Sequence, residues 1–150
     1  FVGADLDVHR DRLSMARSIA VRAGLSCPDR HIALGSCLVL QAGLEGGQQL
    51  IEQAGNRFPS AIICSSDTVA MGVLSALAAD GRRVPDEVSV TGFDDLLLSR
   101  LTTPPLTTLH QPVEEMTRRA LDVIIAGKSK PTALRMPLEL IQRGSTGRSL

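Results

Sequence analysis

The apolar and polar positions of the chain follow two alternating periods, one typical of helices and one typical of strands. In RDRLSMARSIAVRA, residues 10–23, apolar side chains recur at every third or fourth position and Gly24 follows as a stop signal, which predicts a helix. The run HIALGSCLVL, residues 31–40, predicts a short strand. Residues 43–54 predict a second helix, although the glycines near its start favour it less.

Residues 60–81 contain the clearest transition from strand to helix. Residues 61–64 are a continuous apolar run, as in a strand covered on both faces, and we expect Cys64 in the core. The Ser-Ser-Asp sequence at 65–67 is suited to capping the next helix, and Gly81 lies where a glycine commonly ends one.

The second half of the chain continues the alternation. A strand is predicted at 88–92, followed by a leucine-rich loop and an extended segment at 106–112. A helix with a proline in its first turn is predicted at 112–126, because proline suits that position, and Gly127 ends it. Residues 133–143 form a last extended segment.

Strands and helices in strict alternation with short links predict an α/β fold, a doubly wound parallel sheet covered on both faces. Ligands of such sheets bind beyond the carboxyl ends of the strands. Polar residues follow each predicted strand, so we expect them to line one site. They are Arg10 and Arg12 at the first helix, Ser36 and Cys37, then Ser65, Ser66 and Asp67, and finally Asp94 and Asp95.

Arginine and carboxylate side chains together suit vicinal hydroxyl groups, which need both donors and acceptors. The predicted site is therefore one for a sugar or polyol. Other roles stay open for several of its members. Asp67 also suits a helix cap, and Arg10 suits a solvated helix surface. Asp95 suits a cap, a solvent-exposed position or a role in fixing the loop that carries the leucines.

The charge and composition narrow the function further. Sixteen basic and sixteen acidic residues leave no net charge, so this chain by itself lacks the basic surface that DNA or anionic lipid requires. Only three aromatic residues are present, which removes the usual platforms for stacking on bases or sugars. The three cysteines and three histidines match no metal or redox spacing, and reduced thiols suit a cytoplasmic protein.

We expect no enzymatic activity and no cofactor, because neither a nucleophile elbow nor a glycine-rich phosphate loop occurs. Asp94 and Asp95 leave one alternative, Mg²⁺-dependent phosphoryl transfer, for which no partner lysine is evident. No stretch is long and apolar enough to span a membrane, and no signal pattern opens the chain. The start FVG looks like the end of a strand, so we expect a fragment whose sheet leaves an edge and an apolar face uncovered.

The order of these motifs resembles the effector-binding core of LacI/GalR-type transcription regulators. The resemblance runs from Arg10-Asp-Arg12 to the final LELIQRGST and is densest at 60–125, which includes VTGFDDLLLS and LTTLHQPVEEM. It implies a two-lobed core like that of periplasmic binding proteins, homodimerisation, a cytoplasmic location and allosteric control by a small molecule. It also implies that operator DNA is read by a separate N-terminal segment absent from this chain.

By the same resemblance, residues 1–110 and 133–150 are the C-terminal lobe and residues 111–132 belong to the N-terminal lobe. Arg12 matches the family's effector-contacting arginine, and Asp94 matches the first acid of its Gly-Phe-Asp-Asp motif. The other predicted ligand contacts depart from the family pattern or have a second role. They are Ser66 in place of an asparagine, Leu38 near a usual aromatic position, and Asp67.

The leucine-rich loop and the helix predicted after Asp67 lie where the family dimerises. Leu97, Leu98, Leu101 and Val73 are accordingly predicted at a two-fold interface. The alternative is that these side chains pack on their own lobe. The leading functional hypothesis is the sensing and dimerising part of a repressor, and a transporter's solute-binding protein of similar fold is the alternative.

Overall fold

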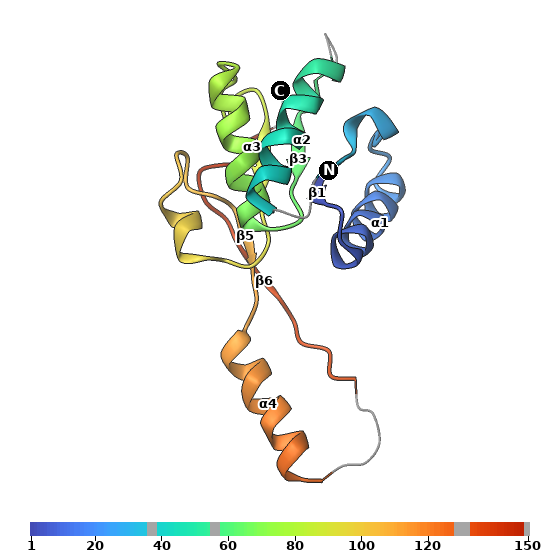
Figure 1. Ribbon diagram of the computed structural model, residues 1–150, viewed down its shortest axis with the longest axis vertical. Coiled ribbons are helices and arrows are strands. Elements are labelled where there is room, and N and C mark those ends of the chain that lie inside the picture. Colours follow the sequence, from blue (N-terminus) through green and yellow to red (C-terminus); the bar gives the residue numbers. More distant parts are fainter. Residues whose placement is uncertain (36–38, 55–57, 128–132, 149–150) are drawn as a thin grey trace.

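The computed structural model describes residues 1–35, 39–54, 58–127 and 133–148. It consists of a body, in which three helices surround a sheet, and an arm that carries the fourth helix away from it (Figure 1). The helices are α1 (Asp7–Arg22), α2 (Val39–Ala54), α3 (Asp67–Ala79) and α4 (Val113–Ile125), with short 3₁₀-helices η1 (Asp29–His31) and η2 (Leu97–Arg100).

The described strands pair in the order β2-β1-β3-β4-β5-β6. Parallel pairing joins β1 to β2 and β3 to β4, while the parallel bridges Val2–Cys64 and Thr91–Thr107 connect these pairs to each other and to β5. Strand β6 pairs with β5 in the antiparallel sense. The bounds are β1 Val2–Ala4, β2 Ala33–Gly35, β3 Ala61–Ile63, β4 Ser89–Thr91, β5 Thr108–His110 and β6 Glu139–Ile141.

The predicted α/β class is confirmed, and the prediction of a parallel sheet holds for β1 to β5. It is wrong for β6, because the chain leaves β5 along the arm and returns beside it in the opposite direction (Figure 1). Residues 39 and 40, predicted as the end of a strand, form the first turn of α2 instead. A short apolar run fits a buried helix as well as a strand, so its pattern alone does not decide between them.

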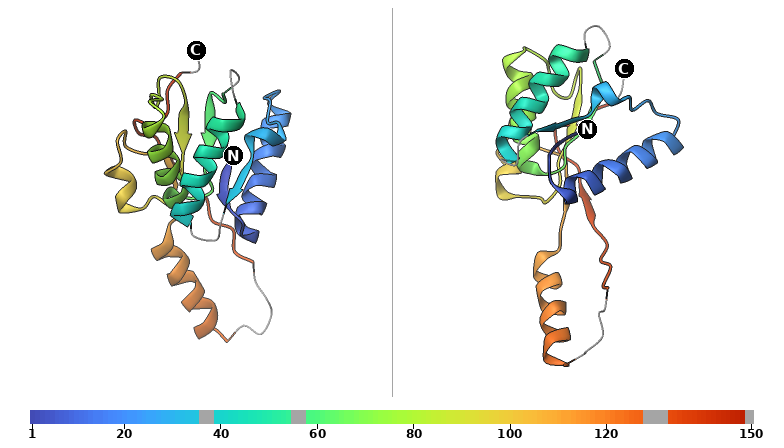
Figure 2. Two further views of the ribbon diagram at one scale, coloured as in Figure 1. Left: turned by 45° about the horizontal axis from the view of Figure 1, so that its top comes forward. Right: turned by 45° about the vertical axis from the view of Figure 1, so that its right-hand side comes forward.

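Helices α2 and α3 cover one side of the sheet and α1 lies on the other (Figure 2). Two glycines let α2 and α3 approach each other closely. A Cβ atom on Gly72 of α3 would lie 2.4 Å from the carbonyl oxygen of Leu40, and one on Gly43 of α2 would lie 2.1 Å from that of Val69. The backbones of the two helices are therefore in direct contact.

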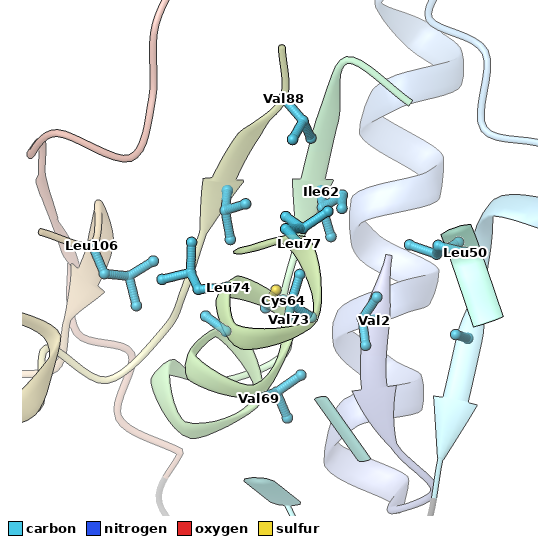
Figure 3. Packing of buried hydrophobic residues seen from close by; sticks show 13 residues of the cluster. Val2, Leu50, Ile62, Cys64, Val69, Val73, Leu74, Leu77, Val88 and Leu106 are labelled. Atoms are coloured by element: carbon cyan, nitrogen blue, oxygen red, sulfur yellow. The ribbon is translucent and has the colours of Figure 1, made fainter. Parts of the chain in front are cut away.

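The core lies between the sheet and the α2–α3 layer (Figure 3). Val2, Ile62 and Val90 of three adjacent strands point into it. Cys64 is buried there, as predicted, and burial raises the pKa of its thiol to about 12. The other large buried members are Leu50, Val69, Val73, Leu77, Val88 and Leu106.

The opposite face of the sheet is only partly covered. On β3, Ile62 faces the core and is 1% exposed, whereas Ile63 faces α1 and is 46% exposed. The prediction that both faces are covered is therefore confirmed for the α2–α3 side alone. The expectation of an uncovered apolar face agrees with this exposure.

The arm has little contact with the body. Helix α4 contains no buried residue and carries exposed apolar side chains such as Ile124 and Ile125. Its separation from the body in Figure 1 is compatible with the assignment of residues 111–132 to another lobe, which stays a prediction.

Candidate functional site

Arg12 joins three strand ends at the carboxyl edge of the sheet. It lies on α1, which directly follows β1. Its Nη1 donates to the carbonyl oxygen of Ser65 after β3, and its guanidinium lies 3.7 Å above the centre of the Phe93 ring after β4. Burial lowers the pKa of Arg12, and the negative charge of Asp94 opposes that shift. The predicted ligand arginine is thus half-buried and fixed in place.

Asp94 occupies a strained position beside Arg12. Its φ angle is 121°, a value that residues with a side chain seldom adopt and that is concentrated at functional sites. Its carboxylate accepts a hydrogen bond from the side-chain amide of Gln111. Burial raises the pKa of Asp94, while Arg12 and the Gln111 hydrogen bond act in the opposite direction. A half-buried carboxylate and a half-buried guanidinium therefore lie close enough to affect each other's ionisation.

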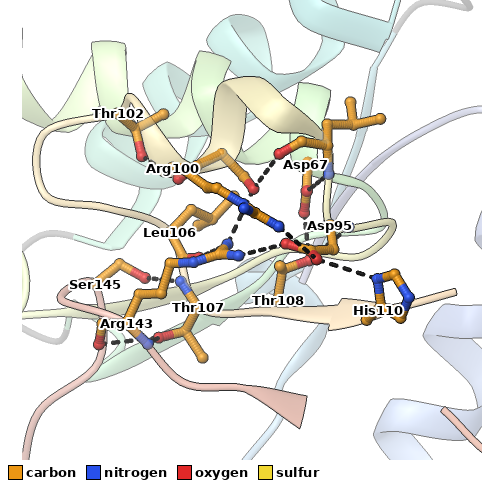
Figure 4. Close-up of polar contacts among 12 residues, drawn as sticks. Asp67, Asp95, Arg100, Thr102, Leu106, Thr107, Thr108, His110, Arg143 and Ser145 are labelled. Carbon is orange, nitrogen blue, oxygen red and sulfur yellow. Dashed lines mark hydrogen bonds and ion pairs between the residues drawn. The ribbon is translucent and has the colours of Figure 1, made fainter. Parts of the chain in front are cut away.

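Asp95 is an anchor for the loop that follows it. Its buried carboxylate pairs with Arg143, lies 3.1 Å from Nδ1 of His110 and 3.6 Å from Nη2 of Arg100 (Figure 4). Burial alone would raise the pKa of Asp95, but the Arg143 hydrogen bond and charge, aided by His110 and Arg100, hold it below its usual value. Capping and solvent exposure, two of the roles that the sequence left open, are wrong for this residue, whereas the third, fixing the loop that carries the leucines, agrees with these contacts.

Asp67 is a structural residue, and the prediction that it contacts ligand is wrong. Its side chain is fully buried and accepts hydrogen bonds from the Thr108 hydroxyl and, at 2.8 Å, from the Leu96 amide (Figure 4). A Cβ atom on Gly92 would lie 2.2 Å from its Oδ1, so the glycine makes room for it. Asp67 ties α3 to β5 and to the start of the leucine-rich loop.

The remaining predicted contacts have separate outcomes. Ser66 is buried and caps α3, with its Oγ accepting from the amide of Val69 at 3.2 Å, so a role in ligand binding stays a prediction. Arg10 is paired with Asp5 at the exposed surface and does not join the site. Leu38, together with Ser36 and Cys37, lies outside the described residues.

Sequence reasoning missed three groups that surround Arg12 and Asp94. Phe93 lies beneath the guanidinium, Gln111 donates to the carboxylate, and His9 bonds to Ser65, which accepts from Arg12. The position of Phe93 and Gln111 just beyond strand ends was a usable signal. No comparable signal marked His9, because a helix residue gives no local sign of what it contacts.

Two hollows are lined by the candidate site residues and their neighbours. A cleft of about 740 Å³ lies between the leucine-rich loop and the first turns of α4, and its lining includes Asp94, Gln111 and Arg118. A mainly apolar groove of about 480 Å³ runs between α1 and the sheet, beside Arg12 and Phe93. Asp94 thus lines the first hollow and Arg12 lines the second, and each hollow combines polar groups with apolar walls, as small-molecule sites do.

The leucine loop, residues 96–101, exposes three of the predicted interface residues. Leu97, Leu98 and Leu101 are 73%, 57% and 71% exposed, so they do not pack on their own lobe. Val73 is fully buried against α2 and the sheet. The family resemblance assigned it to a subunit interface, and this assignment is wrong because the side chain lies in the core.

Within the described ranges, no cluster of three or more His, Cys, Asp or Glu side chains is arranged to hold a metal ion. Across the same part of the chain, none of the helices combines the length and apolar character needed to cross a membrane.

The sequence and the fold match a known class of protein. Residues 1–146 match the family model of the periplasmic binding protein-like domain. Among curated proteins, the ribose operon repressor of Escherichia coli K12 is 36% identical over 140 residues, which cover 91% of this chain and 42% of that protein. The transcriptional repressor CytR of the same strain is 36% identical over 129 residues, covering 83% and 37%.

Solved structures agree with this match. A sugar-binding transcriptional regulator of the LacI family from Escherichia coli, complexed with phosphate, has a TM-score of 0.81 at 29% identity and covers 96% of this chain and 52% of its own. A transcriptional regulator CelR–cellobiose complex has a TM-score of 0.78 at 30% identity, covering 89% and 41%. The chain belongs to the periplasmic-binding-protein-like family, in the branch of the LacI-type transcriptional regulators.

The chain spans about two fifths of the length of these curated relatives. Both relatives are named as repressors, and the prediction that the chain is not an enzyme agrees with those names.

Proposed function

We propose that this chain is the ligand-sensing and dimerising part of a transcriptional repressor, and that Arg12 and Asp94 hold a sugar or related polyol. The observation that carries the proposal is the placement of two half-buried charged groups at the carboxyl edge of the sheet. The Arg12 guanidinium lies over Phe93 and donates to Ser65, and the carboxylate of Asp94, the next residue after Phe93, accepts from Gln111. Together they offer the paired donors and acceptors that vicinal hydroxyl groups require.

The names of the similar proteins support this class of ligand. A ribose operon repressor and a regulator complexed with cellobiose both concern sugars. These relatives also favour a repressor over the solute-binding protein of a transporter.

The proposed domain division follows from the arm. Residues 1–110 and 133–150 form one lobe, and residues 111–132 pack in a second lobe across the ligand. Gln111 lies at the junction and already contacts Asp94, so ligand binding at Asp94 acts at the point where the two lobes join. A ligand that binds the closed arrangement more tightly shifts the equilibrium between DNA-competent and DNA-incompetent states.

The proposed assembly is a cytoplasmic homodimer that reads operator DNA through a separate N-terminal segment. Three exposed leucines on one short loop form an apolar surface suited to a two-fold contact. The net charge of zero is compatible with DNA binding being left to another segment.

The test is calorimetric titration of the protein with D-ribose, D-glucose, sucrose and cellobiose. We expect one of these sugars to bind and Asp94→Asn to weaken that binding by about 10- to 100-fold, since a hydrogen bond to a charged group contributes roughly 1.5–3 kcal/mol. Asp86→Asn is the matched control, because Asp86 is an exposed acid outside the site. Equal binding by wild type and Asp94→Asn would show that the site assignment is wrong.

A further inference from the structure

His9 is a buried histidine in the first turn of α1 that the proposed ligand contacts do not use. It is 5% exposed. Its Nδ1 lies 3.0 Å from the backbone nitrogen of Ala4 and 2.9 Å from Oγ of Ser65. A backbone amide can only donate, so Nδ1 must accept, and the geometry assigns the ring as neutral with its proton on Nε2.

Ser65 connects this histidine to the proposed ligand site. The Ser65 hydroxyl bonds to His9, and the Ser65 carbonyl oxygen accepts from Arg12. The Ser65 amide donates to the carbonyl of Val2 at 2.9 Å, which fixes the residue to β1. His9 and Arg12 are three positions apart on α1 and so lie on one face of the helix. Ser65, which follows β3, thus contacts both His9 and Arg12 on that face of α1.

We propose that neutral His9 is a positioning residue for Arg12, which it holds over Phe93 by fixing the first turn of α1 to Ala4 and Ser65. The inference rests on the proposed function, in which Arg12 binds the ligand. In this proposal His9 does not contact the ligand and acts only by positioning Arg12.

Protonation of His9 is incompatible with this arrangement. A proton on Nδ1 would face the Ala4 amide hydrogen and would remove the acceptor that Ser65 uses. Of the described groups that face His9, Ala4 of β1 and Ser65 after β3 are neutral, and Arg12 on α1 is positively charged. Burial, followed by the charge of Arg12, lowers the pKa of His9 below its ordinary value of 6.5. We therefore expect acid to displace Arg12 from Phe93 only at pH values below 6.5.

The first test observes Arg12 without any ligand. The full chain contains three phenylalanines, Phe1, Phe58 and Phe93, so labelling with 4-fluorophenylalanine gives three ¹⁹F resonances. The Phe93 resonance reports the guanidinium above its ring, and Phe58, which lies under Arg82 at 3.9 Å, is an internal control. We expect the Phe93 resonance to shift with an inflection below pH 6.5 while the Phe58 resonance does not.

Two variants decide the cause of that shift. His9→Asn keeps an acceptor oxygen near the position of Nδ1 but does not titrate, so we expect the inflection to disappear and the neutral-pH position to be retained. His9→Leu removes the acceptor, and we expect its Phe93 resonance to be displaced already at pH 8. Persistence of the inflection in His9→Asn, or an unshifted Phe93 resonance in folded His9→Leu, would overturn the inference. Asp94→Asn removes any inflection that comes from Asp94.

The second test uses the sugar panel described above. Displacing a contact group by about 1 Å can weaken an oriented interaction by up to about 100-fold. We expect His9→Leu to lose about 10- to 100-fold in sugar affinity and His9→Asn to retain it. Wild-type affinity in His9→Leu would overturn the inference and leave the proposed function intact. Because the fluorine measurement needs no ligand, it decides the positioning of Arg12 even when no sugar of the panel binds.

Discussion

Asp94 and Asp95 are adjacent acids in the sequence GFDD, yet they meet opposite surroundings. Burial raises the pKa of Asp94, whereas the Arg143 hydrogen bond and charge overcome burial and lower the pKa of Asp95. Both residues have positive φ angles, 121° and 58°. Their carboxylates contact different partners, Gln111 for Asp94 and Arg143 for Asp95. Ionisation of Asp94 therefore lowers the free energy of unfolding, as expected for a binding group, whereas ionisation of Asp95 raises it.

The Asp95–Arg143 pair is expected to contribute strongly to stability. Asp95→Asn leaves Arg143 without its buried counter-charge, and breaking a buried pair in this way typically costs about 3 kcal/mol of the free energy of unfolding. The folded pKa of Asp95 lies below its ordinary 3.8, so its contribution is present above pH 3.8 and is lost as the pH falls through the folded value.

Urea unfolding of wild type and Asp95→Asn at pH 7 and at pH 3 measures both effects. The difference between the two proteins is expected to be largest at pH 7 and smaller at pH 3. Asp94→Asn provides the contrast, because removing an acid whose pKa is raised leaves stability at pH 7 unchanged or increased. A loss of stability in Asp94→Asn equal to that in Asp95→Asn would contradict the division of roles.

At the scale of elements, the contact between α2 and α3 determines how the main layer packs. The glycines of GLEGGQQ looked like weak points in a helix, because glycine favours helices less than alanine does. In the structure, Gly43 and Gly72 are the points at which the two helix backbones meet. Propensity describes a single helix, so it carries no information about the neighbour that requires a glycine.

Gly72→Ala is therefore expected to destabilise the protein despite the better helix propensity of alanine. The added Cβ would lie 2.4 Å from the Leu40 carbonyl oxygen, and separating the helices to relieve such overpacking costs about 1–3 kcal/mol. Ser75→Ala, at an exposed position of the same helix, is the control and should change stability by less than about 0.5 kcal/mol. Thermal and urea unfolding measure the difference, and a stabilised Gly72→Ala would mean that the helices separate freely.

At the scale of the whole molecule, the leucine loop lies on the surface of the body, and a partly buried arginine, Arg143, fixes it through hydrogen bonds and an ion pair. Arg143 bonds to Asp95, to Oγ of Ser99 at 3.0 Å and to the carbonyl oxygen of Leu106 at 2.8 Å. Arg143 thus holds the residue before the loop, Ser99 within it and Leu106 beyond it, while the leucines of the loop stay exposed. A rigid apolar projection of this kind is suited to a subunit interface, as we proposed.

Leu98→Glu is expected to weaken dimerisation by about 30-fold or more, because a central interface residue typically contributes at least 2 kcal/mol. Val21→Glu, which replaces an exposed apolar residue on α1, is the control and should leave the dimer intact. Sedimentation equilibrium over a range of protein concentrations measures both dissociation constants. Equal effects of the two substitutions would mean that the leucine loop is not the interface.

The sequence by itself determined the alternation of strands and helices, the α/β class and the polar strand ends that include Arg12 and Asp94. These features are local, since periodicity, caps and turn residues are set by near neighbours in the chain. The tertiary structure alone decided that Asp67 and Val73 are buried, that β6 runs antiparallel and that His9 reaches Ser65. Each of these depends on groups distant in sequence, whose approach no local pattern encodes.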